Sequence, residues 1–550
     1  MDESHPDGAC PLVCRYHCCR DFDVTWSVCD VTRMVLWLLI LIPILAAPLA
    51  WMGQQWSRNA PRWIAIGTLS VDCLLTLLLL SQDHSVQTSG HGSWLVESHS
   101  SWIPRWGISL HLGLDGLSVI LILLTAFIGL LAIGASWTEI QSRVGFFHCN
   151  VLLALGGVIG VFLAIDLFLF FFFWELMLVP MYLLIAIWGH AHRRYASFKF
   201  FLFTQAGSLL MLVAIIALAL LHQHATGRPS FDYADLMELT VTHGMAWWLM
   251  LAFLIGFVVK LGAPPFHSWL PDTYTEAPTG ASIILAGILA KTGAYGLLRF
   301  TIPLFPGVMS EFAPLVMGLG TVGILYGAVL ACCQTDIKRL VAYSSISHMG
   351  FFLLGAFAGT ELALQGAVMQ LVAHGLSTGA LFMLAGALQE RFQTRDMRQM
   401  GGLWGMTPRL ATMALFFACA SLGLPGLANF IGEFLVLFGS YSAQPVLTIL
   451  ASLGMVMAAI YSLGMMQRTF FGQQRETRIA PDLSNTAFGT LLLIAVLQIW
   501  LGLYPKTVLI TTKPVMNMLV QPVVASPNLT HQPSESVSSS TIFTSQVSAP

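Results

Sequence analysis

Four ionisable side chains of this 550-residue chain stand inside long apolar stretches, where a charge needs a specific reason. They are Glu175, Lys260, Lys291 and Glu433. In the middle of a lipid bilayer, a charged side chain costs between about 2.5 and more than 10 kcal/mol. Because ionisable residues at such depth commonly mark ion or proton pathways, four of them in one chain predict a function beyond packing.

These residue types are suited to carrying protons. In general, burial lowers the pKa of a lysine and raises that of a glutamate, and an approaching partner of opposite charge reverses both shifts. A buried lysine beside a buried carboxylate can therefore load or release a proton when the distance between them changes. This chemistry needs no cofactor. We predict that Glu175 pairs with Lys260 and that the four residues form a relay.

Each of the four charges also has a structural interpretation. Lys260 stands three residues before Ala263, so it could be a helix-end lysine that extends its ammonium towards water. Glu175 could belong to a purely structural ion pair, and Glu433 could stabilise the N-terminus of a half-helix. Lys291 lies near the middle of its apolar stretch, which is too deep for an easy extension to the surface.

Two histidines, His348 and His374, also stand within apolar stretches. Hydroxyl groups can order waters for proton transfer, but they also form hydrogen bonds between helices. We therefore expect the two histidines either to join the relay or to serve as helix contacts, and a haem held between them is a further alternative. The hydroxyl residues near them in the sequence are Ser344, Ser345, Ser347, Ser377 and Thr378.

Three other histidines stand near expected helix ends. His267 follows Pro264 and Pro265, and we expect it to form a structural contact there. His190 and His192 stand in a basic loop and are expected to be solvated. None of the three is assigned to the relay.

The composition identifies the environment of these residues. Hydrophobic residues make up 56% of the chain and charged residues only 9%, whereas soluble proteins carry about 25% charged residues. This excludes a soluble enzyme and a disordered scaffold, and the formal net charge of −2 excludes the basic face of a nucleic-acid binder. A polytopic membrane protein remains, with lipid rather than water around its outer surface.

Motifs for redox cofactors are missing from the sequence. There is no CxxC cluster for iron–sulfur, no Rossmann fingerprint and no P-loop, and the ten cysteines form no disulfide framework. We therefore expect neither a cofactor nor a metal centre in this chain.

Apolar runs of about 20 residues predict membrane-spanning helices. The runs are continuous rather than alternating, so strands are not expected to span the membrane. The thirteenth run is too long for one helix and is expected to include the second half of a broken twelfth helix. Fourteen candidate spans lie at 34–51, 63–81, 116–136, 146–165, 167–188, 198–221, 246–263, 279–300, 312–333, 338–358, 361–388, 409–430, 433–470 and 486–504.

Proline interrupts two of these spans. Pro264 has no N–H to bond the carbonyl of Lys260, and Pro425 affects the carbonyl of Ser421 in the same way. Breaks in corresponding helices of two halves are typical of transporters with inverted repeats. The seventh and twelfth spans would then correspond, which predicts two inverted five-helix repeats in an all-α membrane protein. The alternative is a pair of unrelated proline kinks.

The predicted organisation has six parts. The tail is rich in Ser, Thr, Pro and Gln, so we expect it to be disordered. The N-terminal extension lacks the order of a signal peptide and is also expected to be disordered. The parts are the extension at 1–33, three helices within 34–136, the first repeat at 146–302, the second repeat at 312–471, a C-terminal helix and end at 486–521, and the tail at 522–550.

The extension contains a group of potential zinc ligands. Its spacing matches no standard zinc site, so we treat it as an extension without a metal. The residues are Cys10, Cys14, His17, Cys18 and Cys19.

Lysine and arginine are distributed unevenly between alternate loops. One set of loops holds fifteen of these residues, whereas the other set holds five, with Arg299 among them. Because the more basic loops face the cytoplasm, we expect the loop after the first span in the cytoplasm and both termini outside.

Four long motifs resemble one known family. They are FFFWELMLVPMYLLIAIWG, KLGAPPFHSWLPDTYTEAPTGASIILAGILAKTGAYGLLRF, DIKRLVAYSSISHMGF and LPGLANFIGEFLVLFGSY. Over roughly 34–520 the sequence resembles the antiporter-like M subunits of respiratory complex I, the proton-translocating NADH:quinone oxidoreductase. The resemblance implies fourteen helices, two inverted five-helix repeats and broken seventh and twelfth helices in a bacterial plasma membrane.

The resemblance also implies a role for each buried charge. Glu175 matches the family's carboxylate on the fifth helix, and Lys260 matches the lysine of the broken seventh helix. Lys291 matches the connecting lysine of the eighth helix, and Glu433 matches the exit-side glutamate of the twelfth. Glu433 discriminates between families, because the sister subunits and the Mrp-type antiporters generally carry lysine there.

His348 and His374 match histidines on the central hydrophilic axis of that family. Tyr274 is a departure, because the family pattern usually has histidine at this position. The departure puts in doubt a role for that loop position but not for the axis.

The implied mechanism is indirect. NADH, FMN, iron–sulfur clusters and quinone are expected in partner subunits, and the partners of this chain are other membrane-arm subunits, lipid and protons, without nucleic acid. Two alternatives stay open: a subunit of an Mrp-type cation/proton antiporter, and an electron carrier that binds haem or quinone. A relative of complex I that takes electrons from ferredoxin, formate or F420 would use a similar chain.

Overall fold

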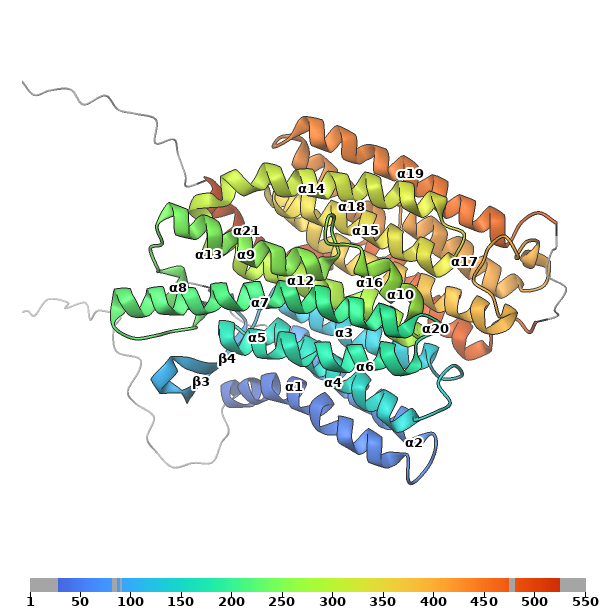
Figure 1. Ribbon diagram of the computed structural model, residues 1–550, viewed down its shortest axis with the longest axis horizontal. Helices are drawn as coiled ribbons and strands as arrows, with labels where there is room; N and C mark the ends of the chain where they lie inside the picture. Colours follow the sequence, from blue (N-terminus) through green and yellow to red (C-terminus); the bar gives the residue numbers. More distant parts are fainter. Residues whose placement is uncertain (1–27, 82–86, 90–91, 474–479, 525–550) are drawn as a thin grey trace, which may run out of the picture.

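The computed structural model describes residues 28–81, 87–89, 92–473 and 480–524. The possible zinc ligands of the N-terminal extension and the tail beyond 524 lie outside the described residues. The described part is a bundle of helices that run along the long axis of the molecule (Figure 1). A strand pair and α8 (Tyr233–Met237) stand at one end of the bundle, which we call the hairpin end; the opposite end is the loop end.

The helices of the first part of the chain follow the predicted spans closely. They are α1 (Val28–Gly53), α2 (Ala60–Ser81), α3 (Gly116–Ala135), α4 (Val144–Leu163), α5 (Leu167–Leu176), α6 (Leu178–Trp188), α7 (Arg193–Thr226), α9 (His243–Leu261), α10 (Trp269–Glu276), α11 (Thr279–Ile284), α12 (Ala290–Gly296) and α13 (Ile302–Leu304). Two π-helical turns, η2 (Leu285–Leu289) and η3 (Leu297–Thr301), join the last three into one long helix.

The second part repeats the pattern of long helices. Twelve helices of the described residues are long and apolar enough to cross a membrane, and α15 and the pair α17–α18 occupy the other two predicted spans. The elements are α14 (Pro306–Cys333), α15 (Ile337–Ala356), α16 (Glu361–Phe392), α17 (Pro408–Ser421), α18 (Ala428–Tyr441), α19 (Pro445–Thr469), α20 (Asn485–Leu503) and α21 (Lys506–Val524), with short 3-10 turns η1 (Pro104–Trp106) and η4 (Leu403–Gly405) in the connections.

Both proline breaks are present where the sequence predicts them. The seventh span is divided between α9 and α10, and the twelfth span is divided between α17 and α18. Gly262 follows α9 with φ +76°, and Gly423 follows α17 with φ +77°. Glycine adopts this left-handed conformation without the steric cost that a Cβ atom would add. The chain can therefore turn sharply at each of the two breaks inside the bundle.

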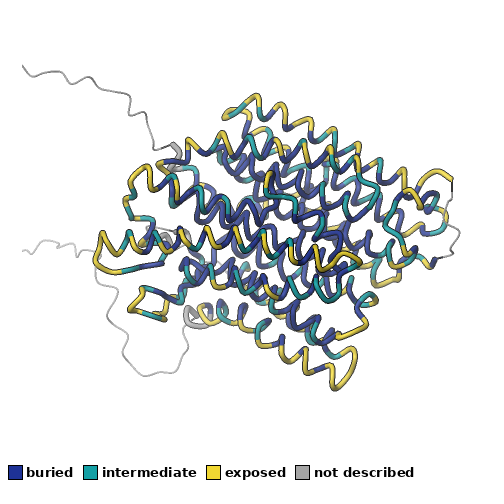
Figure 2. The backbone as a smooth tube through the Cα atoms, viewed as in Figure 1, coloured by how far each residue is buried: buried dark blue, intermediate teal, exposed yellow. Residues whose placement is uncertain are grey.

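The outer helices and the inner helices differ strongly in burial, as Figure 2 shows. In the most apolar window of 279–304 every residue is buried, whereas only 33% of the corresponding window of α19 is buried. Large apolar side chains are exposed on the outer helices, for example Leu202 and Val213 on α7 and Val456 on α19. An exposed apolar surface of this kind suits contact with lipid.

Four short strands, the short helix α8 and one further helix were not predicted. The strands are β1 (Gln87–Ser89), β2 (Gly92–Trp94), β3 (Val96–Ile103) and β4 (Ile108–Leu114), paired as two antiparallel hairpins between α2 and α3. They lie outside the helical spans, so the membrane-spanning architecture remains helical. The further helix, α21, contacts α3, α16 and β2 and forms an ion pair between Lys513 and Glu361 at 3.6 Å.

Candidate functional site

Glu433 lies on α18, shortly after the break between α17 and α18, and is fully buried. Its Oε1 atom is 2.9 Å from Nδ1 of His348 on α15, and it accepts a hydrogen bond of 3.2 Å from Nε2 of Gln370 on α16. Glu433 stands beyond the first turn of α18, which contains no acidic residue. Stabilisation of a helix N-terminus therefore does not explain the position of this carboxylate.

His348 connects this carboxylate to two further helices. Its Nε2 atom is 3.2 Å from Oγ of Ser421 on α17 and 3.3 Å from the hydroxyl of Tyr461 on α19. Because both ring nitrogens make hydrogen bonds inside the protein, neither is left to ligate a haem iron. The geometry thus argues against a haem held between His348 and His374.

Lys291 lies on α12 and is fully buried. Its Nζ atom donates to the carbonyl of Ala286 at 2.5 Å and is 2.6 Å from Nδ1 of His374 on α16. The carbonyl belongs to the π-helical turn η2, which ends two residues before Lys291. Such turns occur often at functional sites, and here the turn places a carbonyl five residues back within reach of the ammonium.

His374 and His348 complete a line of polar side chains. Their rings lie 5.6 Å apart, centroid to centroid, with an interplanar angle of 56°. The line Lys291–His374–His348–Glu433, which we call the axial line, therefore passes from α12 through α16 and α15 to α18. Nε2 of His374 and Oε2 of Glu433 have no hydrogen-bond partner in the described part of the chain, so each keeps a position at which a proton could be exchanged.

Lys260 and Glu175 are arranged differently. Lys260 ends α9 with only 2% of its surface exposed, so its ammonium does not reach water, and the ammonium lies 4.8 Å from the ring centroid of Trp174. Such a cation–π contact stabilises a buried ammonium. No ion pair joins Glu175 to Lys260 among the described residues, although the carboxylate attracts the ammonium electrostatically from a greater distance. The predicted contact is therefore not made.

A close helix crossing brings Lys260 towards the axial line. Gly293 of α12 packs against α9, where a Cβ atom would lie 2.7 Å from the carbonyl oxygen of Phe257 and 3.3 Å from Cβ of Lys260. Only glycine permits this approach. The structure thus joins four of the six predicted residues in two hydrogen-bonded pairs whose histidine rings are neighbours. It places Lys260 on the neighbouring helix, without a hydrogen bond to Lys291 among the described contacts.

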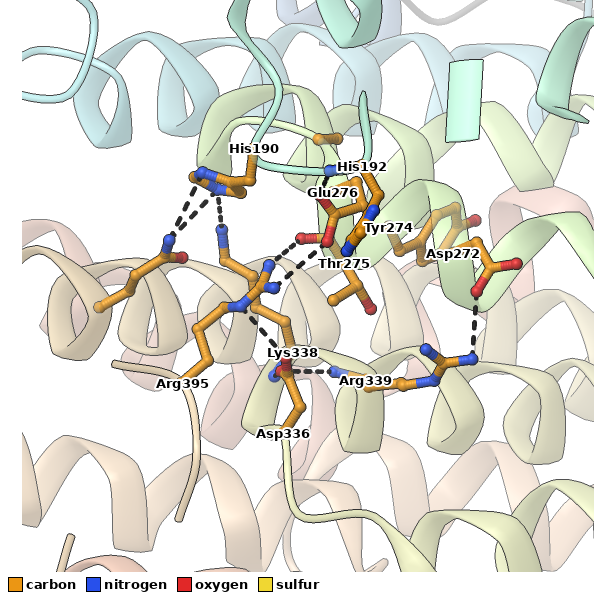
Figure 3. Close-up of polar contacts among 12 residues, drawn as sticks. His190, His192, Asp272, Tyr274, Thr275, Glu276, Asp336, Lys338, Arg339 and Arg395 are labelled. Atoms are coloured by element: carbon orange, nitrogen blue, oxygen red, sulfur yellow. Dashed lines mark hydrogen bonds and ion pairs between the residues drawn. The ribbon is translucent and has the colours of Figure 1, made fainter. Parts of the chain in front are cut away.

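A second polar cluster lies at the loop end (Figure 3). The Arg395 guanidinium contacts Glu276 at 3.2 Å and Asp336 at 3.1 Å, and Nζ of Lys338 is 3.2 Å from Nε2 of His190. His190 is therefore only partly solvated, with 24% of its side chain exposed, whereas His192 is exposed. Burial, together with the charges of Lys338 and Arg395, lowers the pKa of His190 to about 3, so this histidine is neutral.

A cavity of about 1020 Å³ lies beside the loop-end cluster. Glu139, His190 and Gln389 are among its lining residues. Burial raises the pKa of the Glu139 carboxyl, although the charge of Lys338 and hydrogen bonds from Thr279 act in the opposite direction. The cavity thus gives polar groups of the loop end access to the aqueous phase.

Several buried polar residues were missed by the sequence reasoning. Gln370 stands one helical turn before His374, and this spacing could have placed both on the same face of α16. Asp72 is fully buried on α2, and its carboxylate has no hydrogen-bond partner among the described residues. Arg299, counted with the loops, is buried on η3 and forms an ion pair with Asp115.

Two positions discussed from the sequence have clear structural contacts. Nε2 of His267 is 3.2 Å from the hydroxyl of Tyr326 on α14, which is a contact next to the first break. Tyr274 is fully buried on α10, and its hydroxyl donates to the carbonyl of Leu285 at 3.1 Å. Tyr274 therefore fixes α10 against the π-helical turn that lies next to Lys291.

Known proteins resemble the chain over most of its length. The profile of the NADH:quinone oxidoreductase/Mrp antiporter transmembrane family matches residues 164–460. NADH-quinone oxidoreductase subunit M of Pseudomonas aeruginosa is 51% identical over 485 residues, which cover 86% of this chain and 95% of that protein. The subunit M of Escherichia coli K12 is 50% identical over 489 residues, covering 87% of this chain and 96% of that protein.

Solved structures have the same fold. A chain of respiratory complex I from Thermus thermophilus with bound NADH superposes with a TM-score of 0.81 at 33% identity, over 89% of this chain and 100% of that chain. A chain of the Mrp complex from Dietzia sp. has a TM-score of 0.77 at 18% identity, over 90% of this chain and 100% of that chain, which is a likeness of fold alone. The chain therefore belongs to the NADH:quinone oxidoreductase/Mrp antiporter family of transmembrane proteins, and within it to the M subunits of NADH-quinone oxidoreductase.

Proposed function

We propose that this chain moves protons across a bacterial plasma membrane as the M subunit of an NADH:quinone oxidoreductase, through Lys260, Lys291, His374, His348 and Glu433. The observation that carries the proposal is the axial line. Its two hydrogen-bonded contacts, Lys291 with His374 and His348 with Glu433, are 2.6 Å and 2.9 Å long. Both lie within the reach that proton transfer between side chains requires, about 2.6–3.2 Å.

The steps follow from the donors and acceptors. The Lys291 ammonium gives a proton to Nδ1 of His374, and the ring releases one from Nε2 on its other side towards His348. His348 gives its Nδ1 proton to Oε1 of Glu433, which it contacts directly. Because the whole line is buried, bulk water does not exchange protons with it during these transfers.

The direction of transfer rests on the distribution of basic residues. Because the more basic loops lie at the loop end, we place this end in the cytoplasm and both termini outside. Protons are taken up at the loop end, pass from Lys260 to Lys291 and leave from Glu433 towards the hairpin end. Electron transfer and quinone reduction occur in partner subunits, and their free energy reaches this chain as a change in the interaction between Glu175 and Lys260.

Replacement of Lys291 in the assembled complex tests the relay. We expect Lys291→Met to lower proton uptake by about tenfold or more, because a missing acid–base group commonly costs factors of this size. Proton uptake and quinone reduction are measured together in sealed vesicles, after the amount of assembled complex has been quantified. Lys513→Met is the matched control, since Lys513 lies exposed on α21 away from the line. Unchanged proton uptake in Lys291→Met would refute the relay.

An Mrp-type antiporter subunit is the second candidate, because the family profile includes both classes. The two functions differ in what drives proton transport. Complex I activity requires proton uptake that depends on quinone reduction, whereas an antiporter exchanges a cation for protons without electron transfer. Proton movement driven by a sodium gradient in the absence of NADH would favour the antiporter.

A further inference from the structure

Three side chains with metal-ligating atoms meet at the hairpin end, outside the axial line. They are His99 on β3, His111 on β4 and Asp232 in the connection before α8. One ligand atom from each lies within 4.8 Å of the corresponding atoms of the other two. Two imidazoles and one carboxylate form a ligand set that Zn²⁺ commonly takes.

The backbone positions these groups. His99 and His111 occupy directly opposite positions in the β3–β4 pair, where cross-strand side chains are close neighbours. Their rings lie 4.8 Å apart, centroid to centroid. The Oδ1 atom of Asp232 accepts a hydrogen bond of 3.0 Å from the backbone N–H of Ala234 at the start of α8, so its Oδ2 atom is directed towards His111.

Glu97 orients the buried histidine. Nδ1 of His111 contacts Asp232, and Nε2 of the same ring is 2.7 Å from Oε1 of Glu97. In metal sites, a ligating histidine usually donates its second ring N–H to a carboxylate, which fixes the ring orientation. Glu97 has this position, and Nδ1 is then the nitrogen that faces His99 and Asp232.

The cluster is accessible from the aqueous phase. His99 is exposed, and a cavity of about 470 Å³ is lined by His99 and Asp232 together with Ser109 and Ser230. Three protein ligands leave one position of a tetrahedral ion for water. The exposed His99 can adjust its rotamer, so an approach of its nitrogen to the ion requires no movement of the bundle.

We propose that His99, His111 and Asp232 bind a divalent transition-metal ion, with Zn²⁺ as the preferred ion, and that Glu97 orients His111. Binding of Zn²⁺ replaces the hydrogen bond between His111 and Asp232 and releases its proton to water. The ion joins the β3–β4 hairpin to the segment that connects α7 with α8. This site is separate from the proton relay and uses none of its residues.

Zinc binding to the purified, assembled complex tests the proposal. Equilibrium dialysis against Zn²⁺, followed by metal analysis, compares the wild-type complex with complexes that carry His99→Ala or His99→Cys. We expect His99→Ala to weaken binding at one site by about tenfold or more, because even outer-shell changes cost metal sites factors of this order. His99→Cys should retain the ion, since thiolate is a zinc ligand.

His224→Ala is the matched control. His224 is an exposed histidine near the end of α7 at the same end of the bundle, and it is not part of the cluster. We expect this variant to bind as much zinc as the wild type. Equal zinc binding by wild type and His99→Ala, or a loss in His224→Ala that matches the loss in His99→Ala, would overturn the proposal.

Discussion

The two broken helices share a backbone design but hold their charges in different ways. In both, a glycine with positive φ follows the first half-helix, and a proline stands within the break. At the first break the ammonium of Lys260 faces the ring of Trp174 and has a carboxylate only at a distance. At the second break the carboxylate of Glu433 is held directly by His348 and Gln370.

We infer from this difference that proton transfer is controlled at the first break and conducted at the second. Protons move between side chains within hydrogen-bond reach or through one bridging water. His348 and Glu433 at the second break already have such a direct contact, whereas the rings of His374 and His348 lie 5.6 Å apart, centroid to centroid. At the first break, Lys260 must move or change partner before a proton can pass to Lys291. Lys260 is held against the ring of Trp174 and attracted by Glu175, so we infer that control lies at the first break and conduction along the axial line.

Replacement of Lys260 should have the largest effect. Lys260→Met removes the ammonium that would both respond to Glu175 and pass protons to Lys291. We therefore expect proton uptake to fall by about tenfold or more. Quinone reduction should fall with it wherever the two processes are tightly coupled. The measurement records both rates in sealed vesicles. A variant with full proton uptake per quinone reduced would show that the first break does not carry protons.

Glu175→Gln should have a strong effect of a different kind. The amide keeps the shape of the side chain but removes the attraction on Lys260, so we expect proton uptake to fall by roughly tenfold. The axial line itself is unchanged by this substitution. Glu311→Gln is the control, since Glu311 is an exposed glutamate that pairs with His243 at 2.6 Å. Unchanged pumping in Glu175→Gln would remove Glu175 from the relay and with it the assignment of control to the first break.

Local signals in the sequence were sufficient to predict both breaks and the buried positions of Lys291 and Glu433. Pro264 and Pro425 each stand beside glycine in an apolar run, and the missing N–H together with a flexible glycine favours a break there. Proline alone does not break a helix of this chain, since Pro43 and Pro48 lie inside α1. Lys291 and Glu433 stand out because a charge in an apolar run is costly wherever the helix packs. These features depend on the residue and its immediate neighbours, which the sequence contains.

Contacts between distant helices were not predictable in the same way. The separation of Glu175 from Lys260 depends on how α5 packs against α9, and no local pattern encodes it. His190 was assigned to a solvated loop because its neighbours are basic, but Lys338, far along the chain, contacts its ring and leaves it only partly exposed. The β3–β4 hairpin was missed although β4, ISLHLGL, alternates apolar residues with Ser, His and Gly, a strand signal that the search for long apolar runs did not include.

Glu433→Gln should have an intermediate effect, and it tests the role of the second break. The amide can still accept a hydrogen bond from His348, but it cannot take up a proton as a carboxylate does. Because Ser421 and Tyr461 offer His348 other partners, we expect proton uptake to fall by about fivefold rather than to vanish. Proton uptake in sealed vesicles is measured for Glu433→Gln and for Lys260→Met, and the two losses are compared. A loss in Glu433→Gln larger than that in Lys260→Met would contradict the division between control and conduction.

The smallest expected effect concerns His190 at the loop end, and it tests whether the cluster beside α15 depends on a neutral histidine. The pKa of His190 is held at about 3, below the ordinary value of about 6.5, by burial and by the charges of Lys338 and Arg395. The folded chain therefore binds fewer protons here than the unfolded chain at acidic pH. The stability that this neutral histidine contributes is present above pH about 6.5 and is lost as the pH falls towards 3.

We therefore expect the thermal unfolding midpoint of the complex to fall more between pH 7.5 and pH 5.5 in the wild type than in His190→Asn. One pH unit below the ordinary pKa corresponds to about 1.4 kcal/mol, so the difference between the two proteins should be modest. His192→Asn is the control, because His192 is exposed two residues away. If His190→Asn loses as much stability on acidification as the wild type, the loop-end cluster does not require a neutral His190. The cluster includes Glu276 at the end of α10, so the first break would then have no pH-sensitive group of this kind on its loop-end side. The contrast between the two breaks would rest on Lys260 and Glu433 alone.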